Sequence, residues 1–504
     1  MAVTHDSLDA AEPLSAVLAD SGSGAALVCP DDERSLTVDE LAAIVDELAG
    51  RLHALGVRRG DRVAIVLDDG PELIELLFAL SALGAAAAPL NPAYTRPEYE
   101  FFLGDLAPRL LLAAAGDAPA AREAAGATAV VDVLRRRGEA PALLSDGEEA
   151  PRSPEFDAGE PDDVALLLHT SGTTSRPKQV PLLQRNLVAS ARATASHYEL
   201  GPNDVSYCAM PLFHVHGLVG STLAQLAAGG SVVTPRRFTP SGFWTQAHDH
   251  GVTWLSASPT FHQAILKRPG DPVETLRFAR SCSSALSPEV MERAERGYGV
   301  PMLQAYGMTE ASHQMTSNPL PPAPRIADSV GLSAGARVRI VDEQWIDTPA
   351  DTPGEVVVAG PGVTPGYLGN DEANAASFRD GWFRTGDRGV LNDGYLYLQG
   401  RLKEMIIRGG ENISPGEIDE VLLSHPAVAE AVCFGIDDEK YGQVVEAAVV
   451  LSGSATEQEL RAHCRRSLAA FKVPGTIRVV DAIPRTPTGK VQRRIVAAEF
   501  GAKP

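Results

Sequence analysis

The stretch 169–180 constrains this chain more than any other feature. It follows an apolar run at 164–168, which predicts a buried strand, and it has the sequence HTSGTTSRPKQV. A turn with several hydroxyls, a glycine and a lysine offers backbone N–H groups, side-chain donors and a cation to one polyanion. It is not the common P-loop, because no glycine precedes Lys178 and no Ser or Thr follows it. We predict a phosphate-binding loop, although an ordinary polar turn explains these residues equally well when they are taken alone.

Length and charge limit the class of protein. With 504 residues the chain is too long for one core, so we expect at least two domains. Its net charge of −21 argues against nucleic acid and an anionic membrane as partners. The five cysteines are scattered, and we find no signal peptide, membrane-length apolar run or peroxisomal address. We therefore expect a cytoplasmic protein, and the oligomeric state, monomer or homodimer, stays open.

Strand-like and helix-like segments alternate along the chain, which favours an α/β fold. The run 62–67 predicts a strand, and 71–83 predicts a helix with proline at its start and glycine after its end. The segment 116–160 is rich in Ala, Gly, Glu and Pro, and we expect it to be peripheral. Short strands are expected over 335–400.

The character of the sequence changes near residue 400. After this point the chain has its own pattern of helices, predicted at 415–424 and 457–468, and strands, predicted at 429–434 and 444–451. We predict a large domain over 1–400 and a small α+β domain over 401–504.

Three further motifs carry residues suited to nucleotide chemistry. In QAYGMTE, at 304–310, an aromatic ring stands beside a small-residue turn and can stack on a purine, while Glu310 is an oxygen ligand suited to Mg²⁺. In GWFRTGD, at 381–387, a tight turn would carry Asp387, and in PRTPTGKVQRR, at 484–494, basic residues surround a glycine. Each motif also has a plainer explanation: a structural turn, a turn-capping aspartate and a solvated charge cluster.

Together with the loop, these motifs resemble the adenylate-forming superfamily of acyl-CoA and aryl-CoA synthetases, luciferases and peptide-synthetase adenylation domains. The resemblance implies ATP, Mg²⁺ and coenzyme A as cofactors, with Glu310 as the metal ligand. It implies catalytic roles for His214, Thr309, Glu310 and Lys490, with Lys490 neutralising charge between the acid and the α-phosphate. The contacts to the nucleotide and to CoA that it implies are Thr170, Ser171, Gly172, Thr173, Thr174, Lys178, Ser284, Ala285, Gln304, Ala305, Tyr306, Gly307, Asp387, Arg401, Lys403, Gly409 and Gly410.

The resemblance also implies two half-reactions. The carboxylate of an acid attacks the α-phosphorus, giving an acyl-adenylate and pyrophosphate. The small domain, hinged near Lys403, then swings so that a thiol can attack the acyl carbonyl and AMP can leave. Gly409 and Gly410 lie where CoA ligases of the superfamily pass the pantetheine arm, although a tight turn explains the pair equally well.

The expected acid pocket is polar. The segments FHVHG, RSCSSAL and ASHQMTSNPL supply histidines and serines, and the superfamily fold implies that they converge. The predicted contacts to the acid are His214, Ser281, Ser283 and His313. Such a pocket suits a small, polar diacid better than a fatty acid, which would need apolar walls. We leave His216 outside this pocket.

The full pattern resembles the oxalate–CoA ligases of plants and fungi, and the plant enzymes share the Ser175-Arg176 variant of the loop. The chain departs from the plant form at Gly307, where that form has alanine, and we expect this difference to be small. The resemblance implies oxalate as the small carboxylic acid. The alternatives are a malonate or other short- or medium-chain acyl-CoA ligase, and a stand-alone adenylation module that loads a carrier protein. A non-catalytic nucleotide-binding descendant is a further alternative.

Overall fold

The computed structural model describes residues 11–19, 24–32, 34–136, 139–170, 177–286, 288–408, 411–485 and 491–501. Contacts within the chain divide it into two units, which we describe separately. The first comprises Met1–Val338 and Val358–Phe383, and the second Arg339–Val357 and Arg384–Pro504. Over the described residues, no helix has both the length and the apolar character that crossing a membrane requires.

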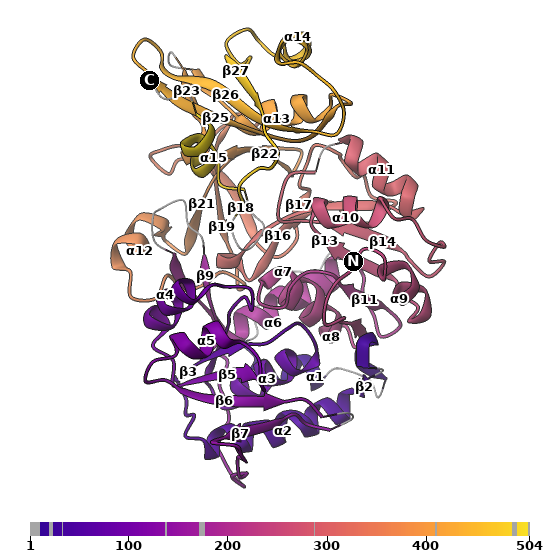
Figure 1. The fold of residues 1–504 in the computed structure, drawn as a ribbon, viewed down its shortest axis with the longest axis vertical. Coiled ribbons are helices and arrows are strands. Elements are labelled where there is room, and N and C mark those ends of the chain that lie inside the picture. Colours follow the sequence, from indigo (N-terminus) through magenta and orange to yellow (C-terminus); the bar gives the residue numbers. More distant parts are fainter. Residues whose placement is uncertain are drawn as a thin grey trace. The chain divides into compact units, whose positions relative to one another are not determined.

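A mostly parallel sheet forms one layer of the first unit (Figure 1). Its central strands are short apolar runs such as RVAIV in β3, as expected for strands covered on both faces. In sheet order its strands are β10 (Lys178–Leu183), β9 (Val164–Thr170), β4 (Ala86–Pro89), β3 (Arg62–Val66), β5 (Leu110–Ala114), β6 (Ala129–Leu134), β7 (Ala142–Ser145) and β8 (Glu148–Glu149). The strand predicted at 62–67 is confirmed as β3.

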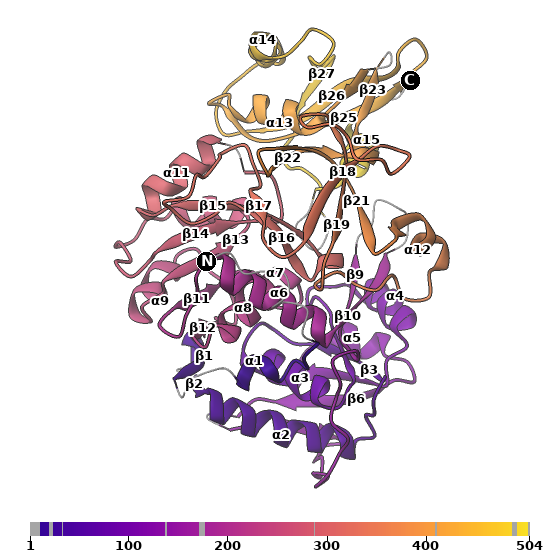
Figure 2. The same cartoon turned by 180° about the vertical axis from the view of Figure 1, so that it is seen from behind.

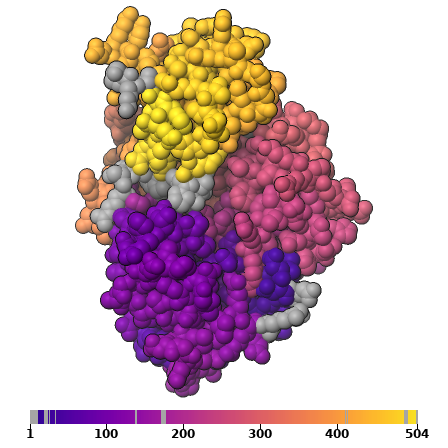
Figure 3. All heavy atoms as spheres, viewed as in Figure 1, coloured from indigo at the N-terminus to yellow at the C-terminus, as the bar shows by residue number. Residues whose placement is uncertain are grey.

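The segment 116–160 lies at the periphery, as predicted. It supplies α5 (Pro119–Ala124) and the three strands β6, β7 and β8 at the far edge of this sheet. Its purple atoms lie at the surface on the face drawn in Figure 3.

A second sheet of the first unit carries most of the predicted site segments. Its inner strands from β1 to β15 are parallel, whereas β2, β16 and β17 are antiparallel to their neighbours. In sheet order its strands are β17 (Leu332–Ser333), β16 (His313–Ser317), β15 (Met302–Met308), β14 (Phe278–Ser281), β13 (Trp254–Ala257), β11 (Val205–Cys208), β12 (Ser231–Val233), β1 (Ala25–Cys29) and β2 (Arg34–Thr37).

Helices α3 (Pro71–Ala82) and α6 (Gln184–His197) each contact strands of both sheets (Figure 2). The helix predicted at 71–83 is confirmed as α3. Its sequence PELIELLFALSA is mostly apolar around the whole helix, as expected for a helix in which nearly every residue is buried. The other helices of this unit are α1 (Ala16–Ala19), α2 (Val38–Ala54), α4 (Arg96–Leu106), α7 (Val215–Gly217), α8 (Ala224–Ala227), α9 (Phe243–Asp249), α10 (Pro259–Leu266), α11 (Pro288–Tyr298) and α12 (Asp371–Ser377).

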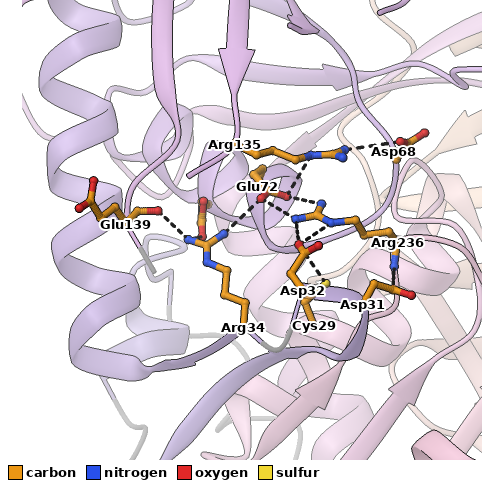
Figure 4. Close-up of polar contacts among 10 residues, drawn as sticks. Cys29, Asp31, Asp32, Arg34, Asp68, Glu72, Arg135, Glu139 and Arg236 are labelled. Atoms are coloured by element: carbon orange, nitrogen blue, oxygen red, sulfur yellow. Dashed lines mark hydrogen bonds and ion pairs between the residues drawn. The ribbon is translucent and has the colours of Figure 1, made fainter. Parts of the chain in front are cut away.

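The burial of α3 places two of its carboxylates inside the protein, where they need cationic partners. Arg34 meets Glu72 at 3.2 Å and Glu75 at 2.8 Å, and Arg236 donates two hydrogen bonds to Glu72 at 2.8 and 2.9 Å (Figure 4). We call these residues, with Asp32, the α3 charge network. It joins strand β2 and the segment after β12 to the buried helix.

The two glutamates of this network have pKa values that are shifted in opposite directions. Burial would raise the pKa of Glu72, but the hydrogen bonds and charge of Arg236 outweigh it and hold this pKa below its usual value. Burial raises the pKa of Glu75 to about 8, and the charge of Arg34 only partly opposes this. Glu75 therefore gains a proton when the chain folds near neutral pH.

The predicted strands over 335–400 form a third sheet. Its order is β18 (Arg337–Val341), β19 (Gly354–Ala359), β21 (Trp382–Asn392) and β20 (Phe378–Arg379), with β22 (Tyr395–Arg401) beside β21.

The second unit also contains a small sheet with helices on both faces. Along β25, Ala431 and Cys433 face the cluster that includes α13 and α14, while Val432 and Phe434 face α15, as strand alternation requires. The elements are β23 (Ile406–Arg408), β24 (Glu411–Ile413), α13 (Pro415–Leu423), β25 (Val428–Asp438), β26 (Gly442–Leu451), α14 (Glu457–Ser467), β27 (Thr476–Val479) and α15 (Arg493–Phe500). The helices and strands predicted after residue 400 are confirmed.

Candidate active site

Asp105 fixes the base of the predicted phosphate loop. His169, near the end of β9, places Nε2 3.0 Å from Asp105 Oδ2, and Gln179 on β10 donates to the same oxygen at 2.7 Å. Burial lowers the pKa of His169, which Asp105 partly offsets. The last strand residue, Thr170, has a buried hydroxyl with no hydrogen-bond partner among the described residues. Ser171, Gly172, Thr173 and Thr174 lie outside the described residues, as does the Ser175-Arg176 variant.

Tyr367 connects the lysine of the loop to the predicted metal ligand. The Lys178 amine lies 4.2 Å from the centre of the Tyr367 ring, and the Tyr367 hydroxyl donates to Glu310 Oε1 at 3.0 Å. Glu310 follows Thr309 in the short 3-10 helix Thr309–Ala311 and is buried. The structure therefore brings the loop and the YGMTE motif together through a tyrosine that belongs to neither.

The residues at this point fit a magnesium ion bound mainly by ATP. Among the described residues, no group of three or more His, Cys, Asp or Glu side chains is arranged to hold a metal. Glu310 supplies one buried carboxylate, and its Oε2 accepts no hydrogen bond from a described residue. Mg²⁺ commonly binds in this way, through one or two carboxylates and the phosphates of its nucleotide.

The predicted turn at Tyr306-Gly307 is wrong. Both residues lie in β15, which pairs with β16 in an antiparallel hairpin. Gly307 allows the backbone of β16 to approach β15 closely, because a Cβ there would lie 1.9 Å from the carbonyl oxygen of His313. Alanine at this position is therefore not a small change for this backbone. Tyr306 is buried beside Ala305, and the buried Gln304 Oε1 has no hydrogen-bond partner among the described residues.

A buried polar cluster lies where β13, β14 and β16 meet α7. Arg280 Nη1 donates to Ser256 Oγ at 2.7 Å, and Arg280 Nη2 donates to His313 Nε2 at 2.7 Å. His216 lies 2.7 Å from the same Ser256 oxygen, and its ring stacks on His313 with centroids 4.9 Å apart. We call His216, Ser256, Arg280 and His313 the β14 cluster.

His216, which we left outside the predicted acid pocket, contacts one of the residues predicted to line it. Its Nε2 meets Ser256, and its Nδ1 lies 2.9 Å from Ser283 Oγ, so it joins an exposed serine of the RSCSSAL segment to the buried cluster. Ser283 has a φ of +75° and His313 a φ of +120°, conformations that non-glycine residues rarely adopt. Strained backbone of this kind is concentrated at functional sites.

The other predicted acid and nucleotide contacts lie around this cluster. His214 is half-buried just before α7, with its ring 4.7 Å from that of Phe213. Ser281 lies on the opposite face of β14 from Arg280, and its buried hydroxyl has no hydrogen-bond partner among the described residues. Ser284 and Ala285 are exposed in the segment after β14.

A partly buried carboxyl also positions the turn before α7. The backbone N–H of Leu212 donates to Asp69 Oδ1 at 2.7 Å, and burial raises the pKa of Asp69 to about 7. Asp69 lies in no motif that the sequence singled out, and neither do Asp105 and Tyr367. A lone polar residue has no periodicity, so only the folded structure identifies these three.

In the second unit, Asp387 and Arg401 form a pair. They are directly opposite on β21 and β22, and Arg401 Nε lies 2.8 Å from Asp387 Oδ1. The predicted tight turn at Asp387 is wrong, because Thr385, Gly386 and Asp387 lie within β21. Gly386 has a φ of +73°. The glycine therefore allows a local distortion within strand β21, and it does not form a turn.

Lys403, the predicted hinge, is exposed in a short 3-10 helix after β22. Lys490, Gly409 and Gly410 lie outside the described residues. Arg485 and Val491, the described residues on either side of 486–490, pair as an antiparallel bridge. The roles in binding and catalysis that the sequence gives to all these residues stay predictions.

Known proteins are similar to this chain in sequence and in fold over nearly its whole length. The model of the AMP-binding enzyme family matches residues 16–368, and that of the AMP-binding enzyme C-terminal domain matches 417–490. The chain belongs to the AMP-binding enzyme family. The predicted superfamily is therefore confirmed, as is the α/β fold with a large N-terminal and a small C-terminal domain.

Relatives narrow the class of enzyme. An oxalate–CoA ligase of Arabidopsis thaliana is 44% identical over 486 residues, covering 93% of this chain and 94% of the relative. A sulfoacetate–CoA ligase of Cupriavidus necator is 39% identical and covers 93% of both chains. The crystal structure of ATP-bound MatB from Rhodopseudomonas palustris superimposes with a TM-score of 0.87 at 29% identity, covering 97% of this chain and 99% of that one. The predicted class, an AMP-forming acid–CoA ligase, is confirmed.

Proposed function

We propose that the enzyme is an ATP-dependent oxalate–CoA ligase. One carboxylate oxygen of oxalate attacks the α-phosphorus of ATP, and the bond from that phosphorus to pyrophosphate breaks. The sulfur of CoA then attacks the carbonyl carbon of oxalyl-adenylate, the bond to AMP breaks, and the thiol proton passes to solvent. The products are oxalyl-CoA, AMP and pyrophosphate.

The β14 cluster is the observation that carries this proposal. Two stacked imidazoles and a guanidinium fill the interior behind Ser283, where a fatty acyl chain would require apolar walls. The packing there is tight, because a Cβ on Gly220 would lie 2.1 Å from His313 Cδ2. Such surroundings favour a very small acid with polar groups at both ends. The Arabidopsis relative supports the same acid.

In this proposal, ATP is held by the predicted phosphate loop and by residues of the YGMTE motif. We propose that Thr170, the loop after it and Lys178 hold the β- and γ-phosphates, since orphaned donors and a cation suit a polyanion. Glu310, oriented by Tyr367, would hold Mg²⁺ together with the phosphates, and the ion would supply charge neutralisation at the reacting phosphorus. Tyr306 would stack on the adenine, with Gln304 beside it.

The second unit supplies the remaining groups in this proposal. Arg401 holds Asp387 in place, so that its carboxylate is oriented to accept hydrogen bonds from the ribose hydroxyls. Lys490 neutralises charge on the α-phosphate during the first step, and the small domain turns about Lys403 before the second. The predicted domain boundary at Arg401 and the cytoplasmic location stay predictions.

A pyrophosphate-release assay tests the proposed function. Purified enzyme, ATP and Mg²⁺ are incubated with oxalate, malonate, sulfoacetate, acetate or octanoate, each with and without free CoA. We expect oxalate to give the highest kcat/KM, and a thioester to form only when CoA is present. Preference for sulfoacetate or malonate would replace oxalate by another short acid, and preference for octanoate would refute the polar pocket. Pyrophosphate release without any CoA thioester would indicate a carrier-protein acceptor.

A further inference from the structure

Arg280 is a fully buried cation. Its Nε donates to the Tyr198 hydroxyl at 2.8 Å, its Nη1 to Ser256 at 2.7 Å, and its Nη2 to His313 Nε2 at 2.7 Å and Gln314 Oε1 at 2.9 Å. None of these four acceptors is a carboxylate. The protein therefore accepts most of the hydrogen bonds that the guanidinium can donate, but none of these acceptors carries a negative charge to balance it.

An uncompensated charge in the interior is costly, and a guanidinium cannot avoid it by losing its proton. Arg34, which is buried in the same unit, shows the usual arrangement, because the carboxylate of Glu72 forms an ion pair with it. Within the part of the chain that the structure describes, no Asp or Glu forms an ion pair with Arg280. The charge of Arg280 thus suits an anion that comes from outside the protein.

His313 is the residue through which Arg280 can act. Because His313 Nε2 accepts a hydrogen from Arg280, the remaining ring hydrogen is on Nδ1. Burial, and next the charge of Arg280, hold the pKa of His313 well below its usual value, so the ring is neutral. Nδ1 has no hydrogen-bond partner among the described residues, although only 2% of His313 is exposed. This ring hydrogen is therefore available to an acceptor on a ligand.

We infer that Arg280 and His313 together receive the second anionic group of the acid. Arg280 supplies the positive charge, and His313, held in one tautomer by Arg280, supplies the hydrogen bond. The enzyme would then require a substrate with a second negative charge close to the reacting carboxylate. This inference rests on the proposed function and makes Arg280 a residue that determines specificity for diacids over monoacids of the same shape.

The first test needs no variant. Oxamate has the shape of oxalate but carries a neutral amide in place of the second carboxylate. A hydrogen bond to a charged group is worth about 1.5–3 kcal/mol, so kcat/KM for oxalate should exceed that for oxamate by roughly 10- to 100-fold. Equal use of the two acids by the wild-type enzyme would overturn the inference. This result does not depend on whether any substituted protein folds.

The second test compares Arg280→Gln with Arg34→Gln. In Arg280→Gln, the oxalate-to-oxamate ratio of kcat/KM should fall close to 1, mainly through a higher KM for oxalate, while KM for ATP is unchanged. Arg34→Gln, which removes a buried arginine from the α3 charge network, should lower thermal stability and leave that ratio as it is in the wild type. An equal loss with both acids in Arg280→Gln would mean a purely structural arginine and would overturn the inference.

The outcome can be separated from failure of the proposed function. If the wild-type enzyme makes no thioester from oxalate, the proposed function fails, and the same comparison is made between whichever diacid is accepted and its monoamide. A charge preference that Arg280→Gln removes would still support the inference, and a charge preference that survives would contradict it.

Discussion

Gly220→Ala tests the position of His313 without removing a polar group. Gly220 lies in the π-helical segment Leu218–Leu223, and a Cβ there would come within 2.1 Å of His313 Cδ2 and 2.3 Å of its Nε2. The His313 ring cannot retreat easily, because His216 stacks against it and Arg280 donates to the same Nε2. The added methyl group must therefore displace the ring or strain the helix.

The cost of this substitution has two parts. Overpacking a well-packed interior costs about 1–3 kcal/mol, which should appear as a lower melting temperature. Loss of the Arg280–His313 hydrogen bond is worth about 1.5–3 kcal/mol, which corresponds to a fall of roughly 10- to 100-fold in kcat/KM for oxalate. KM for ATP should not change, because Lys178 and Glu310 are not in contact with the displaced ring.

Steady-state kinetics with oxalate and with ATP, combined with thermal unfolding, measure both parts. Gly104→Ala is the matched control: Gly104 lies in α4, and a Cβ there would meet nothing within 4 Å. This control should keep full activity and gain up to about 1 kcal/mol of stability, since alanine favours helix over glycine. Wild-type kcat/KM for oxalate in a folded Gly220→Ala enzyme would refute the assignment of His313 to the acid pocket.

Two further predictions concern the nucleotide side and the α3 charge network. Tyr367→Phe removes the hydrogen bond to Glu310, so kcat/KM for ATP should fall by roughly 10- to 100-fold while KM for oxalate is unchanged; an unaltered ATP profile would remove Tyr367 from the site. Burial raises the pKa of Glu75 from 4.5 to about 8, so its contribution to stability is fully present below pH 4.5 and is lost as pH rises through 8. Unfolding free energies of wild type and Glu75→Gln, measured from pH 6 to pH 9, should show the steeper decline in the wild type, and parallel curves would contradict the assigned protonation.

Much of the fold could be predicted because its elements have strong local patterns. Helix α3 is bounded by Pro71 and a following glycine, and its apolar sequence matches its burial between two sheets. In the C-terminal region, the side chains of β25 alternate between its two faces, and each face packs against helices. Local sequence and tertiary packing agree in these elements, so propensity and periodicity were sufficient to predict them.

The turns predicted at two glycine-containing motifs are wrong. A glycine beside an aspartate or a tyrosine indicates a turn when the sequence is taken alone. In the structure, Gly307 and Gly386 both lie in strands, the first because β16 approaches it closely and the second because it has a positive φ within β21. Both causes depend on the neighbouring strand, which the local sequence does not specify.

The β14 cluster could be predicted only in part. His313 and Ser283 came from the resemblance to acid–CoA ligases, but Arg280 and His216 did not. Arg280 stands in a strand between Ala279 and Ser281, where a single arginine has no periodic signal. Its importance comes from its burial among acceptors that are not carboxylates. These acceptors lie 24 to 82 positions away in the sequence, so the local sequence does not identify them.

The most direct test of the central claim is to identify the thioester formed by the purified enzyme. Oxalate, ATP, Mg²⁺ and CoA are incubated with the enzyme, and the CoA products are identified by mass spectrometry while AMP and pyrophosphate are quantified. We expect oxalyl-CoA, with one AMP and one pyrophosphate formed for each thioester. The absence of oxalyl-CoA from an enzyme that forms a thioester with octanoate or sulfoacetate under the same conditions would contradict this expectation.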